Sequence, residues 1–193
     1  LSAIDNAVVE RCAGRVLDVG AGAGSLSAVL QRRGHAVTAI DISPYAVAVA
    51  KRRGVAEVVD ADLFGFEGGP FDTLLMLGIG MVETIAGLKR LLAGAESLLA
   101  SNGQLLVDSM DVRATADPAT LAYHEANRKA GRYAGEVRMQ FEFQGRKGPW
   151  CGWLYVDAET LTTHAQAAGW LCEVVHQEAN GAYLARLRKR VTV

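Results

Sequence analysis

The sequence predicts an α/β fold: a doubly wound, mostly parallel sheet of seven strands that ends in an antiparallel strand pair, with a β-hairpin inserted after the fifth strand. Short apolar runs alternate with helical stripes through the first 107 residues, which is typical of a parallel sheet covered on both faces. Glycines follow the first apolar run at alternate positions. Beyond residue 107 the pattern changes to a hairpin and a final pair of strands.

The parallel half is predicted from five apolar runs and three helical stripes. Each of the first two stripes ends at a glycine, Gly34 or Gly54, and the third ends at Asn102-Gly103, as helices commonly do. The predicted strands are residues 15–20, 36–41, 57–60, 71–77 and 104–107, and the predicted helices are residues 25–33, 44–53 and 85–99.

The second half is predicted to open with strands at 136–143 and 150–156 around the loop Gly145-Arg146-Lys147-Gly148. Asp157 is then expected to cap a helix at 158–168, and residues 171–178 and 183–190 form the final antiparallel pair. Residues 111–156 are therefore an insertion between the fifth strand and the last helix.

Length and composition fit one domain over residues 1–193. The chain is 50% hydrophobic, so it can bury a substantial core, and it has no stretch long enough to be a linker. A net charge of −1 gives no general attraction to nucleic acid or to an anionic membrane. The basic run at 186–190 fits an exposed edge strand with solvated charges.

The cysteines and histidines point to a reducing compartment and to no metal site. Three cysteines are an odd number without metal-ligand spacing, and the four histidines fall in separate predicted elements. No apolar stretch is long enough to span a membrane. We therefore expect a cytoplasmic protein.

The glycine-rich stretch predicts a close approach between backbone and ligand. Gly20, Gly22 and Gly24 follow a strand that contains Asp18, and without a Cβ each glycine lets a ligand come near the chain. The dinucleotide pattern would require a sixth-place glycine, where this chain has serine, so the spacing fits D-x-G-x-G-x-G instead. A tight strand-to-helix turn is the alternative explanation.

Asp41 is the second candidate for the same site. It ends the second predicted strand, 21 positions after Gly20, so both residues should reach the carboxyl edge of a parallel sheet. A carboxylate there can accept hydrogen bonds from both hydroxyls of a ribose. The alternative is an acid at the start of the helix that Ser43-Pro44 would cap.

With these motifs the chain resembles the class I S-adenosylmethionine-dependent methyltransferases, from about residue 15 to the C-terminus. The resemblance implies that the glycine loop lies against the methionine part of the cofactor, that Asp41 holds the ribose and that Asp62 contacts the adenine amino group. Asp60 is a rival for that last role. The residues so assigned to S-adenosylmethionine are Asp18, Gly20, Ala21, Gly22, Gly24, Asp41, Ile42, Asp62, Leu63, Leu77 and Gly78.

The insertion is expected to shape the acceptor pocket, because in that family this region commonly does so. Tyr133, Trp150 and Trp153 are the candidates for its wall, and for each of them the alternative is that it packs the hairpin onto the sheet. Residues 77–81 lack the Asn or Asp, two prolines and aromatic residue that amino methyltransferases of nucleic acid and glutamine carry there. A small-molecule acceptor is therefore expected.

Methyl transfer needs few catalytic side chains, because holding donor and acceptor in line can supply about 7 to 11 kcal/mol of the barrier. Asp108, near the end of the fifth strand, is the candidate base or orienting group, with a turn cap as the alternative. Two other functions stay open: a nicotinamide-dependent oxidoreductase, which the glycine spacing disfavours, and a non-catalytic S-adenosylmethionine-binding protein.

Overall fold

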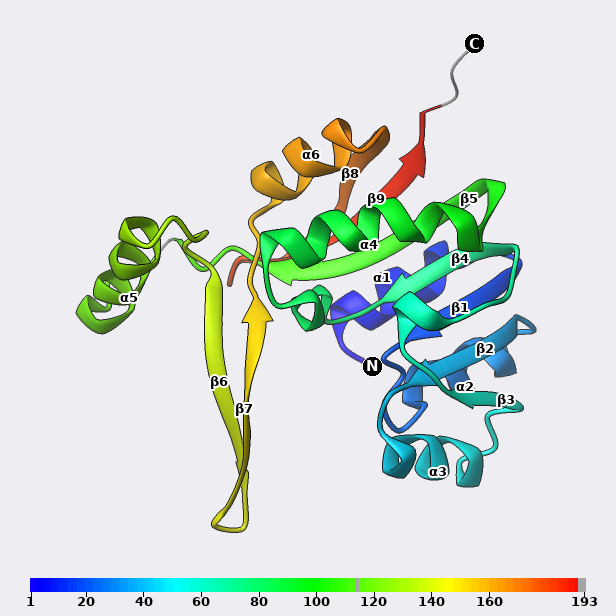
Figure 1. The fold of residues 1–193 in the computed structure, drawn as a ribbon. Coiled ribbons are helices and arrows are strands. Elements are labelled where there is room, and N and C mark those ends of the chain that lie inside the picture. Colours follow the sequence, from blue (N-terminus) through cyan, green and yellow to red (C-terminus); the bar gives the residue numbers. More distant parts are fainter. Residues whose placement is uncertain (114, 191–193) are drawn as a thin grey trace.

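A seven-stranded sheet forms the centre of the protein in a computed structural model that describes residues 1–113 and 115–190. Its order is β3-β2-β1-β4-β5-β9-β8 (Figure 1), and only the pairs β5–β9 and β9–β8 are antiparallel. The strands are β1 (Arg15–Val19), β2 (Ala36–Asp41), β3 (Glu57–Asp60), β4 (Phe71–Met76), β5 (Leu99–Met110), β8 (Trp170–Gln177) and β9 (Ala182–Lys189).

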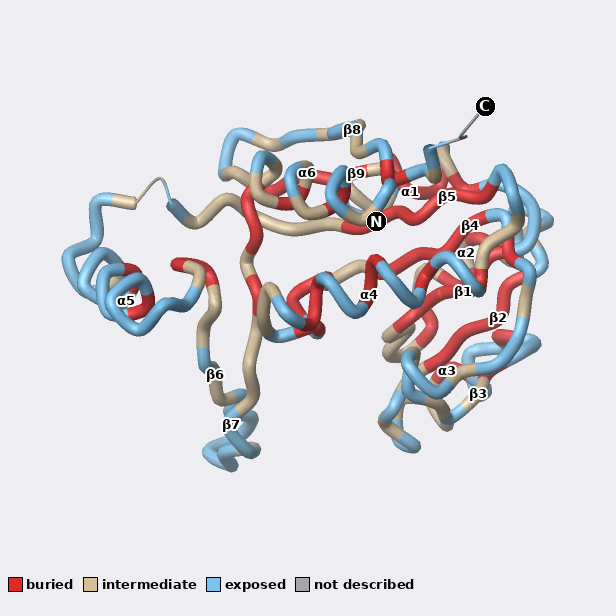
Figure 2. Tube along the Cα trace, turned by 45° about the horizontal axis from the view of Figure 1, so that its top comes forward, coloured by how far each residue is buried: buried red, intermediate tan, exposed pale blue. Residues whose placement is uncertain are grey.

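Helices cover both faces of the sheet, as the alternating pattern predicts. One face packs on α4 (Ile85–Leu98) and α6 (Ala158–Ala167), and the other on α1 (Ala3–Arg11), α2 (Ser25–Arg32) and α3 (Pro44–Arg52). Neighbouring strand residues alternate between the two cores: Leu17 joins the α4 side and Val16 the α1 side. The buried trace in Figure 2 follows these strands.

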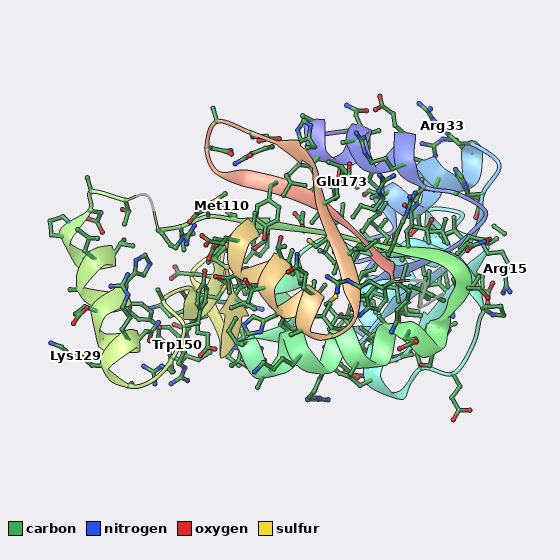
Figure 3. The ribbon with its side chains drawn as sticks, turned by 90° about the horizontal axis from the view of Figure 1, so that it is seen from above. Arg15, Arg33, Met110, Lys129, Trp150 and Glu173 are labelled. Carbon is green, nitrogen blue, oxygen red and sulfur yellow. The ribbon has the colours of Figure 1, made fainter. Side chains whose placement is uncertain are left out.

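A second, two-stranded sheet stands beside the carboxyl edge of the first. Its strands are β6 (Glu136–Phe143) and β7 (Arg146–Leu154), and α5 (Pro118–Lys129) lies on the far side of β6 (Figure 1). Seen from above in Figure 3, Lys129 and Trp150 lie at the end of the molecule opposite Arg15, where β1 begins. The insertion is therefore gathered at the carboxyl end of the parallel strands.

The predicted fold class is confirmed, with local corrections. β5 begins at Leu99 rather than at residue 104, because its first residues pair with Phe71 across an irregularity in the ladder. The hairpin turn is Gln144-Gly145, both with positive φ (49° and 75°), so Arg146 to Gly148 belong to β7. The basic run at the end of the chain lies mostly in β9, which is an interior strand; the edge strand is β8.

Two helices were not predicted, α1 and α5. Both lack a strong apolar stripe, because α1 buries only Ala7, Val8 and Val9 and α5 buries the polar His124 and Asn127. Among the described helices, none combines the length and apolar character that crossing a membrane requires.

Candidate functional site

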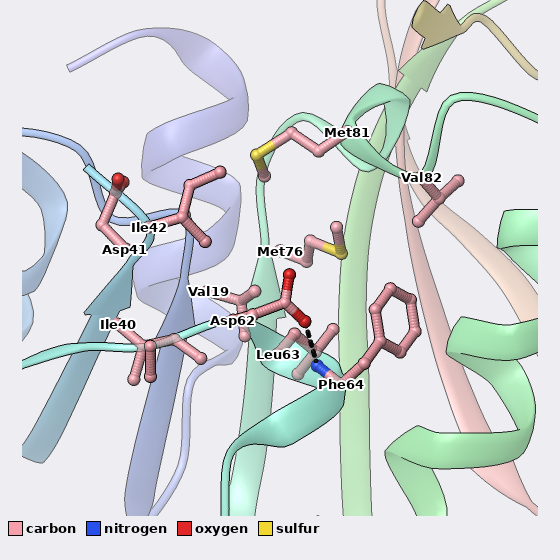
Figure 4. A pocket seen from close by; sticks show the side chains of 12 residues that line it. Val19, Ile40, Asp41, Ile42, Asp62, Leu63, Phe64, Met76, Met81 and Val82 are labelled. Carbon is pink, nitrogen blue, oxygen red and sulfur yellow. Dashed lines mark hydrogen bonds between the residues drawn. The ribbon is translucent and has the colours of Figure 1, made fainter.

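A cavity opens where β1, β2 and β4 end, as expected for ligand sites in open α/β sheets (Figure 4). Its volume is about 120 Å³. The predicted residues in its lining are Gly20, Asp41, Ile42, Asp62 and Leu63. The residues that sequence reasoning missed are Val19, Ile40, Ala61, Phe64, Met76, Met81 and Val82.

Asp41 joins the glycine loop to the end of β2. Its Oδ2 accepts a hydrogen bond from the Gly22 N–H at 2.8 Å, and its Oδ1 accepts one from the Ser43 N–H at 2.8 Å. Ser43 in turn caps α3 through the Ala46 N–H. The Asp41 carboxylate therefore lines the cavity and also holds the backbone at the start of α3.

The three glycines of the loop all have positive φ, but they need to be glycine for different reasons. A Cβ on Gly20 would lie 2.5 Å from the Cε of Met81. A Cβ on Gly24 would lie 2.8 Å from Val55 Cγ2 and 2.9 Å from Ala50 Cβ, so this glycine lets the loop pack on α3. A Cβ on Gly22 would meet no protein atom within 4 Å. The open side of Gly22 is thus the part of the loop that a ligand can approach.

Asp18 lies beneath the loop, outside the cavity lining. It is buried in β1, and its Oδ2 accepts a hydrogen bond from the Ser27 hydroxyl at 2.5 Å. Burial raises the pKa of Asp18 to about 6, against the lowering effect of Ser27. In the structure Asp18 therefore joins β1 to the start of α2 through Ser27.

Asp62 faces the cavity from the chain after β3. Its Oδ1 accepts a hydrogen bond from the Phe64 N–H at 2.7 Å and so caps the short helix η1 (Leu63–Gly65), while its second oxygen points into the cavity (Figure 4). Its rival Asp60 ends β3 outside the lining. Of the two acids, Asp62 is the one placed to meet a ligand.

Met81 crosses the cavity from η2 (Ile79–Val82), the turn that follows β4. Its side chain reaches over Gly20 toward Ile42 (Figure 4). A ligand pocket for a drug-sized molecule is usually about 300 Å³ or more, so a nucleoside cofactor would require this unbranched side chain to rotate. An apolar residue in a turn gives no sequence pattern that would have predicted this position.

Two predicted residues after β4 lie beside the cavity. Leu77 packs into the apolar cluster on the α1 side. Gly78, in the left-handed region with φ 92°, donates its N–H to the Asp108 carboxylate. Burial raises the pKa of the Asp108 carboxyl, and the hydrogen bond from the Gly78 N–H opposes this rise. Asp108 thus fixes the turn at Gly78, as the turn-cap alternative states.

The aromatic candidates of the insertion lie in three different places. Trp153 covers Gly78 and Gly80, so it packs the hairpin onto the turn after β4. The Tyr133 hydroxyl donates to Asp157, which begins α6, and burial together with that carboxylate raises the pKa of Tyr133 to about 12. Trp150 is 59% exposed and lines a second cavity on the hairpin. No group of three or more metal-binding side chains comes together within the described residues.

Comparison with known proteins decides what this arrangement is. A family model described as "Methyltransferase domain" matches residues 17–107. An S-adenosylmethionine-dependent methyltransferase from Bacteroides fragilis, solved in complex with S-adenosyl-L-homocysteine, is 31% identical with a TM-score of 0.85 over 99% of this chain and 78% of that one. This chain belongs to the S-adenosylmethionine-dependent methyltransferases.

Other members of this methyltransferase family agree with the assignment. The ubiquinone biosynthesis O-methyltransferase of Xylella fastidiosa (strain 9a5c) is 32% identical over 105 residues, which are 50% of this chain and 42% of that protein. The chain thus matches less than half the length of this curated relative. A methyltransferase from Methanosarcina mazei, at 16% identity, shares the fold with a TM-score of 0.74 over the whole chain. The two relatives above 30% identity favour methyl transfer over nicotinamide-dependent oxidation.

Proposed function

We propose that this protein binds S-adenosylmethionine in the cavity at the ends of β1, β2 and β4 and transfers its methyl group to a small-molecule acceptor. One observation carries the proposal: Asp41, Asp62 and the open side of Gly22 meet at one sheet edge in a methyltransferase fold. The cavity walls are apolar apart from these carboxylates, which suits a nucleoside with a few polar anchoring points.

Each residue near the cavity has a distinct role. Gly22 gives the cofactor's amino-acid arm a stretch of backbone free of side chains, and Asp41 accepts from the ribose hydroxyls while it holds the Gly22 N–H. The free oxygen of Asp62 accepts from the adenine amino group. Asp18 supports the loop from below through Ser27. Ala21 packs the loop onto the apolar cluster beside α3, and Leu77 packs the turn after β4 onto the cluster beside α1.

S-adenosylmethionine supplies an electrophilic methyl group on a sulfonium, so the protein has mainly to position the acceptor and exclude water. Asp108 acts as a positioning residue, because it fixes the Gly78 N–H at the end of β4. Residues 111–156, with Tyr133, Trp150 and Trp153, form the acceptor side. A small-molecule acceptor is supported by the O-methyltransferase of ubiquinone biosynthesis among the relatives.

We further propose that residues 1–193 act as one domain in a reducing, cytoplasmic setting. Its cysteines are free, and Cys12 is buried in the α1 core, where oxidation would disturb packing. A formal net charge of −1 supports a partner other than nucleic acid.

Calorimetric titration tests the cofactor assignment directly. We expect S-adenosylmethionine and S-adenosylhomocysteine to bind and NADH not to bind. Asp62→Asn should weaken both ligands by about tenfold or more, because an amide has one acceptor oxygen whereas the Phe64 N–H and the adenine amino group together require two. Asp60→Asn is the matched control, since Asp60 lies two residues away and outside the cavity.

Equal affinities for Asp62→Asn and Asp60→Asn would remove the adenine role of Asp62, and binding of NADH alone would overturn the proposed cofactor. Turnover separates an enzyme from a non-catalytic binding protein. Release of S-adenosylhomocysteine together with a one-methyl mass gain on a metabolite is the expected result.

A further inference from the structure

A second cavity, of about 460 Å³, lies between the end of η2 and the base of the hairpin. Glu83 is part of its lining and follows Val82, which lines the first cavity, so the two linings are consecutive along the chain at this point. Gly152 opens this space: a Cβ there would lie 2.8 Å from Glu83 Cβ and 2.9 Å from its Oε2.

Charged groups of both signs line this second cavity. Arg138 sits opposite Gly152 in the β6–β7 ladder, with its guanidinium 5.8 Å from the Trp150 ring centre. Arg132 donates to the neutral Asn127 Oδ1 at 3.1 and 2.9 Å. Within residues 1–113 and 115–190, neither arginine forms an ion pair with an acidic side chain. The Arg138 guanidinium and the Nη1 end of Arg132, which does not contact Asn127, are therefore available to an anion.

Glu83 is held in an unusual backbone conformation beside these arginines. Its φ is 66° and its ψ is −40°, and the Thr84 N–H donates to the Val82 carbonyl at 2.7 Å, which makes a γ-turn centred on Glu83. Residues other than glycine rarely occupy the centre of such a turn, because this backbone conformation costs free energy. The turn places the Glu83 carboxylate against Gly152 in the second cavity, one residue after Val82 of the first.

We propose that this second cavity binds the methyl acceptor, and that the acceptor is a small carboxylic acid that also carries an amine or hydroxyl group. Arg138 and Arg132 bind its carboxylate, and Glu83 accepts a hydrogen bond from its N–H or O–H on the side of the first cavity. Trp150 and Tyr123 contact the part of the molecule between these groups. This assignment rests on the proposed methyltransferase function.

The arrangement follows from the chemistry of its groups. A guanidinium offers paired N–H donors that match a carboxylate, and an ionised carboxylate has acceptors but no donor. An acceptor with an acid at one end and a proton donor at the other satisfies both. Because the arginines are exposed, salt should weaken their contribution.

The test uses matched acid and amide probes on the protein with bound S-adenosylhomocysteine. L-tyrosine, L-tryptophan and 4-hydroxybenzoate are each compared with their carboxamides by calorimetry. In a parallel assay S-adenosylmethionine replaces S-adenosylhomocysteine, and methylation of each probe is followed by its gain in mass. At least one acid should bind about tenfold or more tightly than its amide. Raising NaCl from about 50 to about 300 mM should reduce that difference.

Variants assign the effect to the cavity. Arg138→Gln should weaken the acid by about tenfold or more and leave the amide and S-adenosylhomocysteine within about twofold, and Arg138→Lys should recover part of the loss. Arg146→Gln, an exposed arginine near the hairpin turn, is the control and should behave as the wild type. Glu83→Gln should weaken the acid and its amide alike.

Acids and amides that bind equally, a panel in which no acid binds, or equal effects of Arg138→Gln and Arg146→Gln would each overturn the proposal. Binding of S-adenosylhomocysteine in the same titrations distinguishes a wrong acceptor class from a wrong proposed function. If it binds and the acids do not, the acceptor class is wrong; if it fails to bind, the proposed function itself is wrong.

Discussion

Gly22 and Gly24 lie two residues apart in the same loop, and alanine at each should separate ligand contact from folding. Both have positive φ, 56° and 69°, so alanine costs roughly 1 to 2 kcal/mol of folding free energy at either position. At Gly24 the new Cβ also approaches Val55 and Ala50 within 3 Å, and such overpacking adds roughly 1 to 3 kcal/mol. We therefore expect Gly24→Ala to lose about 2 to 5 kcal/mol.

The binding effects should run in the opposite order. The Cβ of Gly22→Ala enters the open space that faces the ligand, so affinity for S-adenosylhomocysteine should fall by about tenfold or more. Gly24→Ala should bind within about threefold of the wild type at temperatures where it is folded. Urea unfolding and calorimetry on the same samples measure both quantities.

Two results would refute this reasoning. If Gly22→Ala binds as well as the wild type, the loop does not approach the cofactor at Gly22. If Gly22→Ala is destabilised as much as Gly24→Ala, its open side is not open in solution. A circular dichroism spectrum matching the wild type shows that each variant is folded before binding is compared.

Three further predictions concern the support of the site. Burial raises the pKa of Asp18 from 3.8 to about 6, so its stabilising contribution is full below pH 4 and is lost as pH rises through 6. Asp18→Asn has no charge to bury, so it should be more stable than the wild type by about 2 to 3 kcal/mol at pH 8 and show no such gain below pH 4. A difference in stability that does not change with pH would contradict the burial argument. Glu83→Gly should have a free energy of unfolding about 1 to 2 kcal/mol higher than Glu83→Ala, because glycine tolerates φ 66°. Equal urea midpoints for the two variants would show that the backbone at Glu83 is not strained. Tyr133→Phe should lose about 1 kcal/mol of stability with unchanged cofactor affinity, since its hydroxyl serves Asp157; a large loss of cofactor affinity would place Tyr133 at the ligand instead.

The cofactor half of the fold could be predicted from sequence because its signals are local. Strands β2 and β3 have the predicted ends, and the acids that close them follow from where parallel strands terminate. The choice between Asp60 and Asp62 required the structure, because two carboxylates two residues apart differ only in where the chain turns after β3.

The acceptor side could not be predicted in the same way. Glu83 has no motif, since its importance comes from a γ-turn and from Gly152 on a strand far along the chain. The aromatic residues were visible in the sequence, but their roles depend on packing: Trp153 covers glycines, whereas Trp150 lines a cavity. Long-range packing of an insertion has no periodicity from which it can be predicted.

The contrast between Asp41 and Met81 has a kinetic consequence. Asp41 already holds the Gly22 N–H and the Ser43 N–H, so the backbone that receives the cofactor is ordered before any encounter and association requires little further ordering there. Entry requires instead the rotation of one thioether side chain over Gly20, and such rotations in exposed side chains take picoseconds to nanoseconds. The cofactor association rate should therefore vary with solvent viscosity, as a diffusional encounter does, and show no slow unimolecular phase.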